Sequence, residues 1–136
     1  MIESPLPPAG VAGTRWFVAA AIAATILLTV YGQVILKWRL AQLPPLPEPL
    51  LAKTARLAWL VFDPWIFSGF VAAFLASLAW MAALSKVELS VAYPFMSLNF
   101  VIVMLLGAWL LAEPLSWPKA IGVLLIVAGT VVASRG

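Results

Sequence analysis

"TILLTVYGQVILKW", residues 25–38, places a polar side chain at every fourth position of an otherwise apolar run. The four polar residues are Thr25, Thr29, Gln33 and Lys37. Residues four apart lie on the same face of an α-helix, so this spacing predicts one polar stripe along a helix. The other faces carry Ile, Leu, Val, Tyr and Trp, which suit a lipid surrounding. The stretch therefore predicts a membrane helix with a single polar face.

The composition of the whole chain is that of a membrane protein. Its 136 residues are 65% hydrophobic and 10% charged, whereas ordinary globular domains are about 25% charged. A soluble domain of this length could not bury so much apolar surface. The sequence has no Cys, no His and five carboxylates, so neither disulfides, nor a protein-built metal site, nor a cofactor is expected. The net charge of +3 is too small and too dispersed to indicate nucleic-acid binding.

Apolar segments predict an all-α, polytopic membrane protein with four transmembrane helices. Each segment has a length suited to a hydrocarbon core of roughly 30 Å. The predicted spans are about 16–38, 64–85, 89–111 and 117–134. Residues 1–14 are rich in Pro, Gly and Ala and are expected to be a disordered lead, so that 15–136 form the four-helix transmembrane domain. Because the number of spans is even, both ends of this domain are expected on one side of the membrane.

The loop 40–63 is the longest polar interruption. "LPPLPEP" cannot be helical, whereas "LLAKTARLAWLVF" places Lys53 and Arg56 among apolar residues. This second part fits a short interfacial helix on the membrane surface. It fits equally an early turn of the second span, and the sequence leaves both interpretations open. The distribution of Lys and Arg between the two sides does not decide the membrane orientation.

A candidate substrate site lies at the end of the first span. In one interpretation, Lys37 extends its ammonium into the headgroup layer and Gln33 bonds a neighbouring helix. In the other, both residues face a polar cavity together with Thr29 and hold an anionic headgroup. A phosphate binds best where a cation and hydrogen-bond donors occur together, and this pattern supplies both. Arg39 is included in the same candidate site.

The third span supplies a second polar face. Ser90, Tyr93 and Ser97 recur at spacings of three and four, so Tyr93 and Ser97 are candidate substrate-binding residues. Tyr93 could instead serve helix packing with its hydroxyl satisfied by a neighbour. Pro94 is expected to bend this helix. Asn99 falls on the opposite side, where it is expected to bond a different helix.

Two acids stand at opposite ends of the third span. Glu88 and Glu113 are candidates for a gating residue or an ion pair, and Glu113 is expected on the same side as Lys37. The sequence shows no buried carboxylate pair, no nucleophile with a base and no phosphate-binding glycine loop. An enzyme is therefore not expected.

Small residues recur in the last span. Gly122 and Gly129 are seven residues apart, with Ala128, Ala133 and Ser134 nearby. Such a strip allows two helices to approach closely. It predicts a helix contact through this face.

Three motifs carry a resemblance to a known family. "GQVILK", "SVAYPFMSLNFV" and "EPLSWPKAIGVLLIVAGTVV" resemble the drug/metabolite transporter superfamily, in particular its four-helix, small-multidrug-resistance-like (EamA-like) branch. Within that branch the chain is most similar to Arn-type flippase subunits. The resemblance implies transport of undecaprenyl phosphate–aminoarabinose across the bacterial inner membrane for lipid A modification. The implied partners are this lipid-linked sugar phosphate, membrane lipids and a second four-helix subunit, in a homodimer or a heterodimer.

One departure separates this chain from the drug exporters that it resembles. Those proteins carry a glutamate three residues before the glycine that matches Gly32, and Thr29 occupies that position here. A threonine cannot bind and release the proton that drives antiport. Two alternatives to a flippase are a small multidrug-type exporter of cations that uses Glu88 or Glu113, and a membrane scaffold subunit without transport activity.

Overall fold

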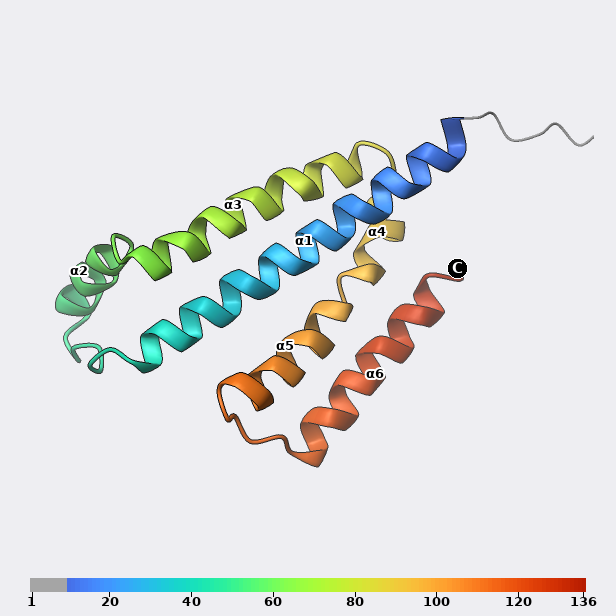
Figure 1. Cartoon of the computed structure of the whole chain (residues 1–136). Coiled ribbons are helices and arrows are strands. Elements are labelled where there is room, and N and C mark those ends of the chain that lie inside the picture. Colours follow the sequence, from blue (N-terminus) through green and yellow to red (C-terminus); the bar gives the residue numbers. More distant parts are fainter. Residues whose placement is uncertain (1–9) are drawn as a thin grey trace, which may run out of the picture.

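Helix α1, Gly10–Ala41, runs the length of the molecule, and α3, α4 and α5 lie along it (Figure 1). The structure is a computed structural model that describes residues 10–136. The other elements are α2 (Leu50–Leu60), α3 (Pro64–Leu84), α4 (Leu89–Phe95), α5 (Leu98–Leu110) and α6 (Trp117–Ala133). Every element in the described part of the chain is a helix. The predicted all-α class is confirmed.

The first helix is longer than the predicted span of 16–38. It begins at Gly10, where the Thr14 hydroxyl donates to the Gly10 carbonyl over 2.9 Å. Residues 10–14 are therefore helical, whereas the sequence placed them in a disordered lead; residues 1–9 lie outside the described part. After Pro8 the sequence holds no further proline before residue 44, so nothing interrupts the helix. At 1.5 Å per residue, its length is about 48 Å, more than a bilayer core.

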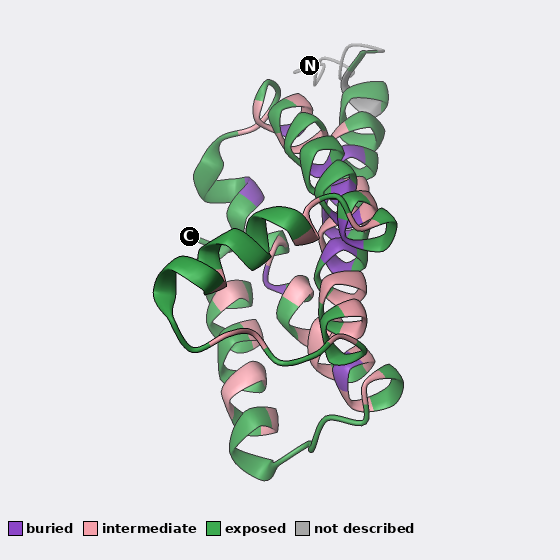
Figure 2. Cartoon of the chain, turned by 90° about the vertical axis from the view of Figure 1, so that its left-hand side faces the viewer, coloured by how far each residue is buried: buried purple, intermediate pink, exposed green. Residues whose placement is uncertain are grey.

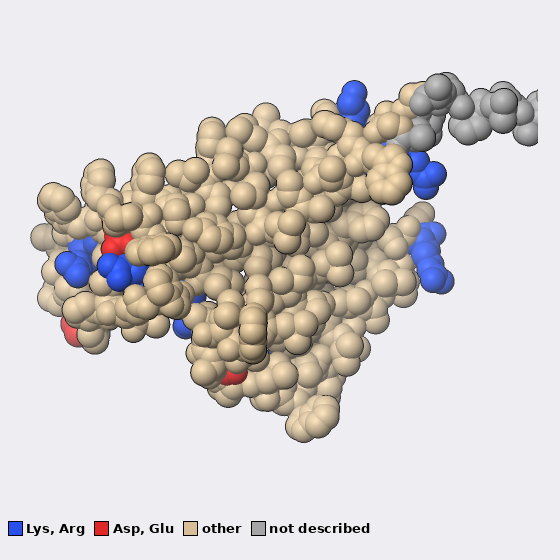
Figure 3. Space-filling model, in the orientation of Figure 1, with Lys and Arg blue, Asp and Glu red and all other residues tan. Residues whose placement is uncertain are grey.

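The chain is a multi-pass membrane protein. Gly13–Ala41, Pro64–Leu84 and Leu89–Leu110 are long and apolar enough to cross a membrane, and α6 is a shorter apolar helix of 17 residues. On the face shown in Figure 3, Lys, Arg, Asp and Glu lie toward the ends of the helices, and uncharged surface separates them. The start of α1 and the C-terminus lie at the same end of the molecule (Figure 1).

The segment after the proline-rich loop forms a helix of its own. A turn separates α2 from α3, with the Asp63 N–H donating to the Leu60 carbonyl over 3.0 Å. Of the two interpretations of this segment, the structure supports a separate helix over an early turn of the second span. No residue of α2 is buried. A position on the membrane surface stays a prediction.

The third predicted span is broken in the middle. Helix α4 ends at Phe95, one residue after Pro94, and α5 begins at Leu98. The Met96 N–H donates to the Tyr93 carbonyl and the Ser97 N–H to the Pro94 carbonyl, over 3.0 and 3.1 Å. Proline removes one backbone donor and clashes with the preceding turn, so the chain tightens here before the helix resumes. The predicted bend is present, and it changes the register of the residues that follow.

Small residues bring α1 and α3 into close contact. The buried residues of α3 are Ile66, Gly69, Ala72, Ala76 and Ala83. In Figure 2 most buried positions lie along the α1–α3 contact, with a few others in α4 and at the α4–α5 break. A Cβ atom added to Gly32 would lie 3.1 Å from the Gly69 carbonyl oxygen. The hydrophobic effect does not drive helices together in lipid, so van der Waals contact at this short distance stabilises the α1–α3 pair.

The glycines of α6 do not make the close helix contact that their spacing predicts. A Cβ atom at Gly122 or Gly129 would meet no atom within 4 Å, and no residue of α6 is buried. Within the described chain, the close contact occurs between α1 and α3 instead. The physical reason is that α6 stands apart from the other helices along much of its length (Figure 1).

Arg39 has a structural partner. Its guanidinium donates to both carboxylate oxygens of Asp63, with Nη2–Oδ2 at 2.8 Å and Nε–Oδ2 at 3.0 Å. Asp63 also accepts from the N–H groups of Trp65 and Ile66 and so caps α3. This pair fastens the end of α1 to the start of α3. The hydrogen bonds from Arg39, assisted by those two backbone N–H groups, hold the pKa of the Asp63 carboxyl below its usual value of 3.8.

We expect Gly32→Ala to destabilise the protein by about 1–3 kcal/mol, because the new methyl group meets a backbone oxygen that cannot rotate away. Thermal unfolding in detergent measures the effect. Gly13→Ala is the matched control on the same helix, since a Cβ atom there meets nothing within 4 Å. Equal stability of the two variants would contradict the assigned contact.

We expect Asp63→Asn to lower the melting temperature at neutral pH, with a difference that disappears in acid. The folded carboxyl has a lowered pKa, so its stabilisation is complete above the unfolded value and is lost as pH falls through the folded value. Melting curves of both proteins between about pH 7 and pH 2 test this, because the loss begins near the unfolded pKa and continues below it. A difference that stays constant over this range would rule out the ion pair as its cause.

Candidate functional site

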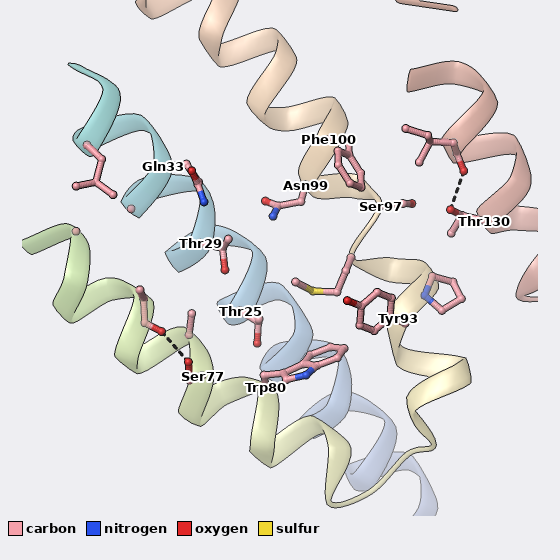
Figure 4. Close-up of a pocket in the computed structure, with 18 of the residues that line it drawn as sticks. Thr25, Thr29, Gln33, Ser77, Trp80, Tyr93, Ser97, Asn99, Phe100 and Thr130 are labelled. Carbon is pink, nitrogen blue, oxygen red and sulfur yellow. Dashed lines mark hydrogen bonds between the residues drawn. The ribbon is translucent and has the colours of Figure 1, made fainter. Parts of the chain in front are cut away.

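A polar cavity lies among α1, α3, the α4–α5 break and α6. Its volume is about 790 Å³, within the range of roughly 300–1,000 Å³ that is usual for ligand sites. Figure 4 shows polar side chains entering it from all four sides. They are Thr25, Thr29, Gln33, Ser77, Tyr93, Ser97, Asn99 and Thr130. We call this space the central cavity.

The stripe on α1 forms one wall of the central cavity. Thr25, Thr29 and Gln33 lie one above another on the cavity side of the helix (Figure 4). The Thr25 hydroxyl donates to the Ala21 carbonyl over 2.8 Å and is buried. Thr29 and Gln33 make no side-chain hydrogen bond with other described residues. The side-chain polar groups of Thr29 and Gln33 are therefore not engaged by the rest of the described chain.

Asn99 lies opposite this stripe. The sequence places it on the far side of the third span, but it lines the cavity and faces Gln33 (Figure 4). The break after Pro94 restarts the helix at Leu98 and so shifts the positions that follow. The Asn99 Oδ1 atom is buried and accepts no hydrogen bond from the described residues. The sequence predicts a bend at Pro94, but the expected position of Asn99 rests on continuous helical spacing, which is unreliable beyond a proline.

The predicted residues of the third span also reach the central cavity. Tyr93 lines it beside Trp80, with ring centroids 6.1 Å apart in an edge-on arrangement. Ser97 lines it at the break and is 8% exposed. Two further hydroxyls, which the sequence did not single out, come from Ser77 and Thr130. Both donate to carbonyls of their own helices, four residues back.

A second space, which we call the turn cavity, adjoins the first toward the α5–α6 turn. Its volume is about 550 Å³. Gln33 and Asn99 line both cavities, so these two amides stand where the spaces meet. Glu113 and Lys119 line the turn cavity. The two cavities thus meet at the amides of Gln33 and Asn99, and the turn cavity also contains the charged residues Glu113 and Lys119.

Lys37 pairs with Glu113 at the edge of the turn cavity. The Nζ–Oε1 distance is 3.4 Å, and the two side chains are 61% and 42% exposed. The ion pair predicted for Glu113 is therefore present. Lys37 and Arg39 do not line either cavity, and Arg39 is held by Asp63. Glu88 precedes α4 at the opposite end and makes no ion pair with the described residues.

The described lining of the central cavity is mainly apolar and carries several polar side chains and no charged ones. Among the described residues, its lining includes hydroxyls, amides and aromatic rings but no Asp, Glu, Lys or Arg. No cluster of three metal-ligating acids occurs in the described part of the chain. Hydroxyl and amide groups donate and accept hydrogen bonds with polyhydroxylated groups. The arrangement suits a neutral, hydroxyl-rich moiety, with charge handled at the turn cavity.

Comparisons with known proteins agree with this architecture. A relative from Pseudomonas aeruginosa (strain UCBPP-PA14), "Probable 4-amino-4-deoxy-L-arabinose-phosphoundecaprenol flippase subunit ArnE", is 38% identical over 86% of this chain and 96% of its own length. An "ArnF" subunit of the same described flippase from Erwinia tasmaniensis is 34% identical over 77% of this chain and 84% of its own. No solved structure matches the chain. Residues 1–135 match the EamA-like transporter family, and the chain belongs to that family.

Proposed function

We propose that this chain is one subunit of a flippase that moves 4-amino-4-deoxy-L-arabinose-phosphoundecaprenol across the bacterial inner membrane. The observation that carries the proposal is a cavity without charged residues in its described lining, in which the Asn99 amide on α5 faces Gln33 on α1. Amide groups both donate and accept hydrogen bonds. Sugar hydroxyls are suitable donors, and the names of the relatives supply the substrate.

The central cavity holds the sugar in this proposal. Thr29 and Gln33 on α1 and Asn99 on α5 offer hydrogen bonds from opposite walls. Tyr93 and Trp80 supply aromatic surface at the other end of the same space. The absence of carboxylates among its described lining residues leaves no charge there to repel a passing phosphate. The polyprenyl chain stays in the surrounding lipid, so only the headgroup crosses along the polar walls.

The phosphate is held near Lys37. An ammonium group binds phosphate oxygens as a point charge and contributes charge-assisted hydrogen bonds. Lys37 stands one turn beyond Gln33, at the end of the polar stripe. Its side chain is mostly exposed, so it can move from Glu113 to a substrate without a change in the fold.

A second four-helix subunit is the proposed partner. The relatives are named as subunits of a flippase, and α6 has an exposed apolar surface with no buried residue. Leu124, Leu125 and Val132 are about 70% exposed. A similar subunit that covers α6 would close the side of the central cavity that α6 lines.

We expect Lys37→Ala to slow substrate movement at least about tenfold, because a charge-assisted hydrogen bond contributes roughly 1.5–3 kcal/mol. The measurement uses protein in vesicles that contain the aminoarabinose lipid, with a membrane-impermeant amine reagent to report outer-leaflet substrate. Lys86→Ala is the control, since Lys86 lies in the α3–α4 turn and makes no ion pair with the described residues. Normal transport by Lys37→Ala protein would end the assignment of the phosphate to this residue.

We also expect the protein to confer no resistance to quaternary ammonium compounds. An exporter that exchanges cations for protons needs a carboxylate in reach of its substrate, and the described lining of the central cavity has none. Growth of a drug-sensitive bacterial strain that expresses the protein tests this. Resistance that Glu88→Gln or Glu113→Gln removes would favour the exporter.

A further inference from the structure

Glu113 is the one acid among the described residues that line the two cavities. Its ion pair with Lys37, at 3.4 Å and with both side chains about half exposed, is a weak contact. A pair of this kind exchanges its partners readily when a better-placed charge arrives.

The chain holds this carboxylate in place with unusual local geometry. Ala112 has a φ of 52°, in the left-handed region that costs an L-residue about 1–2 kcal/mol. The turn lets the Glu113 N–H donate to the Gly107 carbonyl over 3.1 Å. The Glu113 side chain then folds back against α5, where a Cβ atom on Gly107 would lie 2.9 Å from Oε2. Backbone strain that persists in this way is common at functional sites.

Two cations stand beside this acid. Lys37 contacts it directly, and Lys119, which also lines the turn cavity, donates to the Pro114 carbonyl over 3.0 Å. An ammonium has three donors, so Lys119 keeps two for another acceptor. The turn cavity therefore holds one negative and one positive group, Glu113 and Lys119, next to the amides of Gln33 and Asn99, and Lys37 reaches Glu113 at its edge.

We propose that Glu113 is the residue that selects an amino sugar: the substrate ammonium replaces Lys37 on Glu113 while the substrate phosphate takes Lys37. This inference rests on the proposed function and adds the basis of its specificity. The headgroup carries one ammonium and one phosphate, and the Lys37–Glu113 pair offers an opposite charge to each of them. Ion contacts are thus exchanged rather than lost, so neither Lys37 nor Glu113 is left without a counter-charge during binding.

A sugar with a hydroxyl in place of the amine is disfavoured for a physical reason. When its phosphate takes Lys37, the Glu113 carboxylate loses its counter-ion and stands near a second negative charge. Glu113 thus repels the phosphate of the hydroxyl sugar, in addition to attracting the ammonium of the amino sugar. A preference of about tenfold for the amino lipid is expected, since one charge-assisted hydrogen bond is worth roughly 1.5 kcal/mol or more.

The test is competition binding to the full chain in lipid nanodiscs. Radiolabelled 4-amino-4-deoxyarabinose phosphoundecaprenol is displaced by the same lipid, unlabelled, or by arabinose phosphoundecaprenol, which has a 4-hydroxyl. The wild-type protein is expected to prefer the amino lipid, and Glu113→Gln to bind the two within about twofold of each other. A Glu113→Gln protein that keeps the full preference would overturn the inference.

A second variant keeps the test valid if Glu113→Gln fails to fold. Gly107→Ala pushes the flexible end of Glu113 out of its seat while the carboxylate remains, so it should also reduce the preference. Gly13→Ala, whose Cβ meets nothing, should not. Equal wild-type binding of both lipids would refute the role of Glu113 and leave the flippase proposal standing. Binding of neither lipid would refute both.

Discussion

The close contact of α1 with α3 is the constraint on which the other features depend. Gly32 and Gly69 bring the two backbones together, and the buried residues Ala72, Ala76 and Ala83 continue small-residue packing toward the C-terminal end of α3. In lipid, apolar side chains gain little by meeting one another, so contact at this distance has to supply the stability. The contact also fixes which face of α1 points elsewhere. The stripe of Thr29 and Gln33 is thereby directed to the space between α3, α5 and α6.

The break in the third span complements that stripe from the other side. A straight helix would keep Asn99 away from Gln33, whereas the tight turn at Met96 and Ser97 brings it to the cavity. Proline in a membrane helix is tolerated where neighbouring groups or cavities accommodate the disturbed backbone. Here the same disturbance places an amide where the two cavities meet. The polar path thus arises from one regular helix and one interrupted helix.

Local sequence patterns were enough to predict the helical class and to place the stripe on one face of α1, because these depend on spacing within one helix. They also placed Glu113 near Lys37, since short turns leave few alternatives. They failed for Asn99, because the helix is interrupted after Pro94 and the spacing of residues before the break does not predict which way Asn99 faces. They failed for Arg39, because Asp63 lies on the far side of a long loop. They did not identify the close contact of Gly32 with Gly69, because glycine spacing alone does not name the partner helix.

The α1–α3 contact has a consequence for how the chain is made. These two helices are separated in sequence by the proline-rich loop and α2, so α1 leaves the ribosome well before its packing partner exists. During that interval its polar stripe and its glycine have no helix to cover them. Insertion of α1 therefore depends on its flanking apolar faces alone, and a stable hairpin forms only when synthesis has passed Leu84. The contact that holds the bundle together therefore joins two helices that are not consecutive in the sequence, since α2 lies between them.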